Sequence, residues 1–176
     1  MWLYLHPHTE YGVSDLAQRI GVPLSTLHRE VVRLDEAGLI TSRTLGRNRL
    51  VRANLDHPAA KPLAHLLEVT FGPRAVIGEE FAIPGADRVV IFGSWAARHA
   101  GEVGTPPRDI DVLVVGTVDR ADVYEAADRA AERLGIEVNP VVRSVHQWVE
   151  PKDALVKQIK ASPHLTVSSV DEMAGA

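Results

Sequence analysis

The residues best suited to chemistry lie between positions 88 and 115. Gly93 and Ser94 follow an apolar run and precede a helix-compatible segment, while Asp109 and Asp111 begin a second apolar run. Residues two apart on a strand share a face and lie about 6.6 Å apart along it. Two carboxylates held that close repel each other unless a cation lies between them, and Mg²⁺ accepts such oxygen ligands. Because a Gly-Ser turn that opens a helix offers N–H groups and a hydroxyl to a phosphate, the segment predicts a site for a nucleoside triphosphate and its metal.

The order of these features resembles the minimal nucleotidyltransferase domains of the DNA polymerase beta superfamily. The family pattern is an apolar strand, Gly-Ser, a short helix, Asp-x-Asp on the next strand, and a third carboxylate on a later strand. The resemblance covers about residues 87–142. It implies a mixed sheet with flanking helices, a nucleotide ligand and Mg²⁺. The nucleotide-binding residues it implies are Gly93, Ser94 and Arg98, and the catalytic metal ligands are Asp109 and Asp111.

The third carboxylate has two candidate positions on the strand expected at 136–142. The family pattern places it at Asn139, whose amide can accept a metal bond but cannot act as a base and carries no negative charge. Glu137 lies on the same strand face, one pleat away, and is the alternative catalytic acid. In a two-metal transfer the third acid helps to hold the metal that activates the attacking hydroxyl. The sequence therefore leaves both an active transferase and a binding-only descendant open.

Each of these residues also has a purely structural interpretation. Gly93 could only end a strand, and Ser94 could only cap a helix, which is the commonest role of such a serine. Asp109 could pair with Arg108, and Arg98 could be an ordinary surface residue. The site prediction therefore depends on the combination of features and not on any one of them.

Composition restricts the class of protein. The chain has 176 residues, enough for one large or two small domains, and its net charge of −4 argues against a protein that coats nucleic acid along its whole surface. Residues 1–56 nevertheless hold seven Lys+Arg against six Asp+Glu, so the acidic excess lies in the remainder. Because cysteine is absent, disulfides and thiolate metal sites are excluded. No signal peptide or run long enough for a membrane span is present, so a cytoplasmic protein is expected.

Residues 13–38 are predicted to form two helices joined by a tight turn at 21–23. The first has an apolar stripe of Val13, Leu16, Ala17 and Ile20, and the second of Leu24, Leu27, Val31 and Leu34. Residues 39–45 and 49–53 then predict a hairpin around a Gly-bearing turn. Only a short helix is expected before Pro7.

This pattern resembles the winged helix-turn-helix of bacterial regulators of the ArsR or MarR kind, carried by SDLAQRIGVPLSTLHREVVRLDEAGLI and the Arg-rich hairpin. The resemblance implies binding to double-stranded DNA, with the second helix in the major groove and the hairpin on phosphates or in the minor groove. Acids at 15, 30, 35 and 36 are expected on faces turned away. The predicted DNA-binding residues are Ser25, Thr26, His28, Arg29, Arg33, Arg43, Arg47, Arg49 and Arg52.

The rest of the chain is predicted to be mostly helical around the strands. Helices are expected at 61–71 and 74–81, where they would connect the two halves, and at 119–134 behind the Asp-x-Asp strand. Trp148, Leu155, Val156 and Ile159 fall at helical spacing and predict one closing helix over the sheet.

The sequence thus predicts an α+β protein with a winged helix-turn-helix at 1–56, a helical connector at 57–85 and a nucleotidyltransferase-like domain at 86–176. The expected function is a homodimeric DNA-binding transcriptional regulator whose second domain binds a nucleoside triphosphate with Mg²⁺ and could transfer a nucleotidyl group. Two alternatives stay open. The protein could be primarily a nucleotidyltransferase that acts on a protein or small-molecule hydroxyl, or an antitoxin-like binding module with a degenerate transferase fold.

Overall fold

The computed structural model describes residues 1–169, which form two compact units that divide between Thr70 and Phe71. Residues 170–176, assigned above to the C-terminal domain, lie outside the described part. Residues 57–85, expected to be a helical connector, contribute one helix to each unit. Among residues 1–169, no helix combines the length and the apolar character that a membrane crossing requires.

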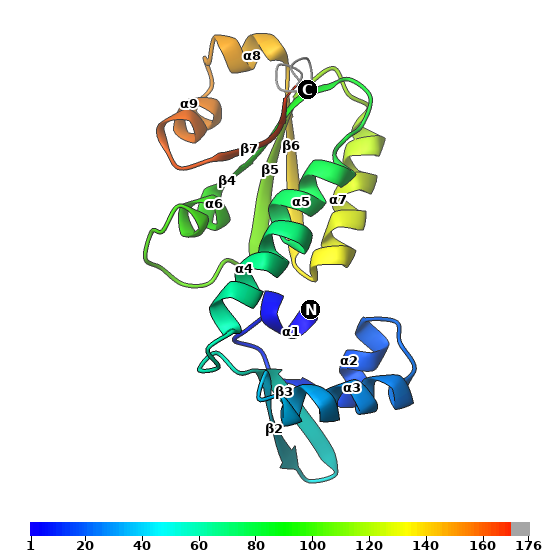
Figure 1. Cartoon of the computed structure of the whole chain (residues 1–176). Helices are drawn as coiled ribbons and strands as arrows, with labels where there is room; N and C mark the ends of the chain where they lie inside the picture. Colours follow the sequence, from blue (N-terminus) through cyan, green and yellow to red (C-terminus); the bar gives the residue numbers. More distant parts are fainter. Residues whose placement is uncertain (170–176) are drawn as a thin grey trace. The chain divides into compact units, whose positions relative to one another are not determined.

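The first unit combines short helices with a three-stranded antiparallel sheet of order β1-β3-β2 (Figure 1). The two adjacent helices and the hairpin form where the sequence predicted them, and the first helix is short as expected. Strand β1 was not predicted. The elements are α1 (Trp2–Leu5), β1 (Tyr11–Gly12), α2 (Val13–Arg19), α3 (Leu24–Glu36), β2 (Ile40–Leu45), β3 (Asn48–Ala53) and α4 (Ala60–Phe71).

Helix α3 packs on the first unit through a narrower stripe than the sequence predicted. Leu27 and Val31 are buried, whereas Leu24 and Leu34 at the two ends of the helix are exposed, as is Ile20 after α2. These outer positions were therefore wrongly assigned to the inner face. The helix ends at Glu36, and the positive φ of Gly38 lets the N–H of Leu39 bond back to the carbonyl of Leu34.

The second unit has an α+β fold around a mixed four-stranded sheet of order β6-β5-β4-β7. Strands β5 and β6 are parallel, and the other two pairs are antiparallel. The elements are α5 (Pro73–Glu80), β4 (Ala86–Phe92), α6 (Gly93–His99), β5 (Asp109–Gly116), α7 (Arg120–Leu134), β6 (Glu137–Arg143), α8 (Val145–Val149), α9 (Ala154–Ala161) and β7 (Leu165–Ser169).

Both faces of this sheet are covered, but by different helices (Figure 1). Ile110, Val112 and Val114 of β5 pack into the larger core with residues of α5 and α7. Leu113 and Val115 alternate with them and pack against Ile159 of α9 in a smaller cluster. Because side chains alternate along a strand, Asp109 and Asp111 lie on the α9 face of the sheet. The central strand is thus buried on both sides except at the end that carries these aspartates.

Two features of the second unit differ from the sequence prediction. The expected single closing helix is two helices, α8 and α9, separated by residues 150–153, which include Pro151. A proline has no N–H for the helical ladder, which is consistent with the interruption. Strand β7 was not predicted and forms the edge of the sheet beside β4. The helix behind β5 was predicted correctly and runs from Arg120 to Leu134.

Candidate functional site

The Asp-x-Asp pair begins the central strand of the second unit. In the register of the sheet, Asp111 lies between Phe92 on β4 and Asn139 on β6, and Asp109 lies opposite Glu137. Both aspartates are half-buried, whereas the residues that follow them on β5 are fully buried. The strand therefore fixes the backbone of both carboxylates firmly and leaves their oxygens accessible.

Gly93 forms the turn that brings Ser94 to these aspartates. Its φ of 73° lies in the left-handed region that favours glycine. A Cβ at this position would also clash with the Asp111 carboxylate, so two independent constraints require glycine here. Ser94 follows in the first turn of α6, and the sequence prediction that Gly93 and Ser94 lie beside Asp111 agrees with this geometry.

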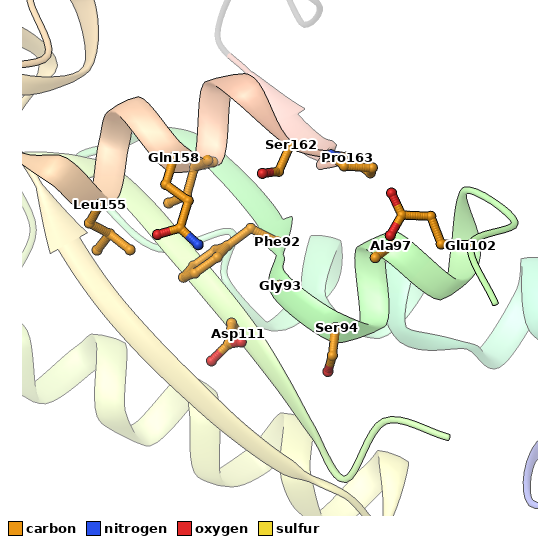
Figure 2. Close-up of a pocket in the computed structure, with 11 residues that line it drawn as sticks. Phe92, Gly93, Ser94, Ala97, Glu102, Asp111, Leu155, Gln158, Ser162 and Pro163 are labelled. Carbon is orange, nitrogen blue, oxygen red and sulfur yellow. The ribbon is translucent and has the colours of Figure 1, made fainter. Parts of the chain in front are cut away.

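A cavity of about 430 Å³ opens beside Asp111 and Ser94. Figure 2 shows Asp111 and Ser94 on one side of it, with Gln158 and Leu155 of α9 on the other. Among the described residues, the lining includes two carboxylates and no lysine or arginine. The lining residues are Phe92, Gly93, Ser94, Ala97, Glu102, Asp111, Leu155, Gln158, Ile159, Ser162 and Pro163.

No cationic side chain among residues 1–169 neutralises the charge of the two aspartates. Burial raises the pKa of the Asp111 carboxyl above its ordinary value, and the negative charge of Asp109 raises it further. Asp109 accepts a hydrogen bond from the Asn139 amide, with 3.1 Å between Nδ2 and Oδ2, and forms no ion pair among the described residues. An amide donor satisfies an oxygen but adds no positive charge. A divalent cation would relieve this repulsion, and the oxygen donors suit Mg²⁺.

The predicted third acid does not join the pair. Glu137 begins the edge strand β6 and is exposed, and the described residues contain no group of three acidic, His or Cys side chains placed to hold a metal ion. Asn139 occupies the neighbouring position and bonds to Asp109 instead. The expectation that Glu137 could complete the catalytic acids is therefore wrong for this geometry.

Arg98 does not line the cavity either. Its Nη1 donates to the backbone carbonyl of Glu102 at 2.6 Å, so the guanidinium holds the turn after α6. The side chain of Glu102 lines the cavity in consequence. Sequence reasoning missed Glu102 because it lies in an irregular loop, and it missed Gln158 and Ser162 because α9 is distant in sequence. No motif marks these three positions.

In the first unit, the exposed face of α3 carries several of the predicted DNA-binding residues. Ser25, His28, Arg29 and Arg33 are exposed, and Thr26 is half-buried. Glu30 lies among them, with its Oε1 3.1 Å from Arg33 and 3.6 Å from Arg29. The expectation that Glu30 faces away from the basic residues is therefore wrong. Helical spacing explains it, because residues three apart lie side by side.

The hairpin arginines are also engaged within the protein. Arg43 donates from Nε to Glu10 at 2.9 Å, and Arg49 bonds to Asp35 at 2.7 Å, so Asp35 does not face away from the basic hairpin as expected. Arg52 donates to the Thr41 hydroxyl at 3.2 Å. Arg47 at the hairpin turn is exposed and has no hydrogen-bonding or ionic partner within residues 1–169. Of the four predicted hairpin cations, only this one is unengaged.

The sequence matches no protein-family model and no curated protein. Solved structures with a similar fold include a toxin–antitoxin complex with AMP-PNP, at 18% identity and a TM-score of 0.40 over 57% of this chain and 77% of that chain. Another is a mutant of the toxin–antitoxin pair MntA–HpeT, at 15% identity and a TM-score of 0.38 over 56% of this chain and 71% of the other. A third is a tri-AMPylated Shewanella oneidensis HEPN toxin with its MNT antitoxin, at 16% identity and a TM-score of 0.35 over 57% and 76%. At this level of similarity, the chemistry of the site has to be inferred from its own residues.

Proposed function

We propose that the second unit binds a nucleoside triphosphate together with Mg²⁺ in the cavity beside Asp111. The observation that carries this proposal is a pair of neighbouring carboxylates without a cationic partner among residues 1–169, one of which, Asp111, lines a cavity that Ser94 also lines. Asp109 and Asp111 would hold the metal, and Ser94 with the amides after Gly93 would contact the phosphates. When bound, Mg²⁺ neutralises charge on the phosphates.

Coupled binding of the two ligands follows from the charges. The cavity wall carries Asp111 and Glu102 and no lysine or arginine among the described residues, so it repels a metal-free triphosphate. Mg²⁺ alone has two carboxylates to bind, and one of them already accepts a bond from Asn139. Each ligand therefore supplies what the other lacks, and their affinities depend on each other reciprocally.

Nucleotide binding is better supported than nucleotide transfer. A transferase needs a group that takes a proton from the attacking hydroxyl or holds the metal that activates it. Asn139 cannot accept that proton, and Glu137 is exposed at the start of the edge strand β6. We therefore place transferase activity second, as a slow reaction that the Asp109–Asp111 pair could support on a protein or small-molecule hydroxyl.

Thermal unfolding with each of ATP, GTP, CTP and UTP, in Mg²⁺ or in EDTA, tests the binding proposal. The wild type should be stabilised by at least one nucleotide with Mg²⁺ and not by that nucleotide in EDTA. Asp111→Asn should lose the stabilisation, whereas Asp128→Asn should keep it, because Asp128 is an exposed aspartate of α7 without a described partner. Equal stabilisation of both variants would exclude the proposed site. Incubation with labelled nucleotides then measures transfer, and Asp109→Ala should abolish any label.

A second candidate function, binding to double-stranded DNA, belongs to the first unit. It is favoured by the exposed polar face of α3 and by Arg47 at the tip of the β2–β3 hairpin, which is exposed and has no partner in the described residues. A winged helix-turn-helix uses these two elements on the groove and the phosphate backbone. Binding as a homodimer would set two such helices about 34 Å apart. The expected contact set is narrower than the sequence suggested, because Arg43 and Arg49 are paired with acids.

Fluorescence anisotropy with a random-sequence duplex tests this candidate. Arg47→Gln should weaken binding to all sequences and flatten the salt dependence by about one phosphate contact. Arg29→Ala, on the exposed face of α3, should instead reduce the preference between sequences. If the wild type binds no duplex even at low salt, the first unit is not a DNA-binding module, and a partner protein becomes the better explanation of its exposed face.

A further inference from the structure

One carboxylate joins α3 to both strands of the hairpin. The Oδ2 of Asp35, in the last turn of α3, accepts from the Ser42 hydroxyl at 2.7 Å and from Arg49 Nη2 at 2.7 Å. Arg49 Nη2 also lies 3.1 Å from the Ser42 hydroxyl, so the three side chains bond to each other pairwise. Ser42 lies on β2 and Arg49 on β3. About two thirds of the Asp35 and Arg49 side chains is shielded from solvent, with 32% and 31% exposed.

The position of these side chains on the sheet makes the connection specific. Ser42 pairs with Val51 across the hairpin, and Val51 is fully buried in the core of the first unit. Arg49 lies two residues before Val51 and thus on the same face. The polar trio therefore continues the core face of the hairpin toward its tip, where apolar packing ends. Beyond the core, the hydrogen bonds of this trio hold the tip of the hairpin against α3.

The charges make this connection costly to break. A carboxylate in the last turn of a helix faces the negative end of the helix dipole, and a cation beside it removes that cost. Arg49 supplies the cation and also bonds to the Ser42 hydroxyl. Hydrogen bonds between charged groups contribute more than neutral ones, so Arg49 would leave Asp35 for a phosphate only at a cost. Arg47, two residues away, has no such partner within residues 1–169.

We propose that Asp35 is a positioning residue for the DNA-binding function suggested above, on which this inference rests. Asp35 holds the hairpin at a fixed angle to α3, so that the exposed face of the helix and Arg47 meet one duplex together. It also withholds Arg49 from the phosphates, although sequence reasoning assigned Arg49 to DNA. Arg49 is thus a structural cation and Arg47 the phosphate-binding one.

The salt dependence of binding to a random-sequence duplex separates the two arginines, because each phosphate contact contributes about 0.9 to the slope of log K against log salt. Arg47→Gln should reduce the slope by about one. Arg49→Gln should leave it at the wild-type value. Asp35→Asn should steepen it by about one, because Arg49 is released to reach a phosphate, and the double variant Asp35→Asn/Arg49→Gln should return it to the wild-type value.

The positioning role has its own readout. A pool of duplexes is first enriched by selection for binding to the wild type. The ratio of affinity for this pool to affinity for the random duplex should be about tenfold lower in Asp35→Asn than in the wild type. The affinity of Asp35→Asn for the random duplex should be kept or raised. A role in folding alone predicts that both affinities fall together and that the slope is unchanged. Circular dichroism and the unfolding temperature report folding for each variant, and Arg49→Gln provides a separate test if Asp35→Asn does not fold.

Three results would overturn the inference, and they are distinguishable. If Arg49→Gln flattens the slope as much as Arg47→Gln, Arg49 contacts phosphate in the wild type, and DNA binding stands while this inference fails. If the wild type binds no duplex at low salt, the DNA-binding proposal fails and this inference fails with it. An unchanged slope in a folded Asp35→Asn variant also contradicts the withholding of Arg49.

Discussion

Carboxylates of the second unit experience opposite environments in two regions. On the face of the sheet that α5 and α7 cover, Glu80 of α5 accepts hydrogen bonds from Arg129 at 2.8 Å and from Arg133 at 2.6 Å. These bonds lower the pKa of the Glu80 carboxyl. At the end of β5, burial and the charge of Asp109 raise the pKa of Asp111. Arginines of the chain balance the first region, whereas no cation in the described part of the chain pairs with the second. The difference indicates that the β5 carboxylates are arranged for a ligand and not for the stability of the fold.

The first unit shows the converse. Its arginines were expected to be free for DNA, but Arg43 and Arg49 are bound by Glu10 and Asp35. A cation with an internal partner adds little to binding, because the partner must be displaced first. In both units, therefore, the groups without a partner among residues 1–169, Asp111 and Arg47, are the better candidates for function. Residue type alone does not make this distinction.

The largest expected effect comes from adding a third carboxylate beside Asp109 and Asp111, which we call the acidic region. Asn139→Asp should replace the amide that bonds to Asp109 with a third carboxylate beside the pair. We expect affinity for Mg²⁺ without nucleotide to rise about 10- to 100-fold, the range by which groups that support metal ligands alter affinity. Isothermal titration calorimetry with Mg²⁺ measures the change, and incubation with labelled nucleotides would show whether transfer increases.

The control for this gain is Glu137→Asp, which keeps an acid on the same strand but outside the cavity lining. Its Mg²⁺ affinity should equal that of the wild type. If Asn139→Asp binds Mg²⁺ no better than the wild type does, the position of Asn139 beside the aspartates has no bearing on a metal, and the acidic region loses its proposed role.

The next largest effect concerns the turn that brings the acidic region together. Gly93→Ala places a Cβ in the left-handed region and against the Asp111 carboxylate. Such a backbone conformation costs a non-glycine residue about 1–3 kcal/mol. Chemical denaturation should show a loss of at least this size, with nucleotide binding lost as Asp111 is displaced. Gly101→Ala is the matched control, because Gly101 also has a positive φ but open space around its Cβ position. Equal losses in both would mean that contact with Asp111 is unimportant.

Most elements of both units, though not β1 and β7, and the Gly93–Asp111 contact pair were predictable, since apolar periodicity and short motifs are local properties of the chain. The partners of charged groups were not. The pairing of Asp35 with Arg49 depends on how far the hairpin folds back on α3, and the role of Arg98 depends on the path of the loop to Glu102. The wall that α9 contributes to the cavity depends on packing across the sheet. Tertiary contacts of this kind leave no periodic signal in the sequence.

A smaller effect follows from the raised pKa of Asp111. Because the folded state holds this proton more tightly than the unfolded state, the wild type loses stability as the pH rises from about 3.9, the ordinary Asp value, through the raised pKa. In EDTA at pH 7, Asp111→Asn should therefore unfold a few degrees above the wild type, and the difference should vanish in acid. Addition of Mg²⁺ with the nucleotide should reverse the order. A variant less stable than the wild type in EDTA at pH 7 would contradict the repulsion.

The smallest expected effect is a loss of stability, and it concerns Glu80 with its two arginine partners. Glu80→Gln removes a carboxylate whose pKa is lowered chiefly by its hydrogen bonds to Arg129 and Arg133, so the variant should be less stable at neutral pH. The deficit should be no more than about 1 kcal/mol, the upper range for ion pairs near solvent. It should be complete above about pH 4.3, the ordinary Glu value, and disappear as the pH falls through the lowered pKa. Glu125→Gln should cost less, because Glu125 is 73% exposed and lies 4.0 Å from Arg129. Thermal unfolding of both variants across this pH range measures the difference, and a Glu80→Gln variant that gains stability at neutral pH, as expected for Asp111→Asn, would remove the contrast between the two regions.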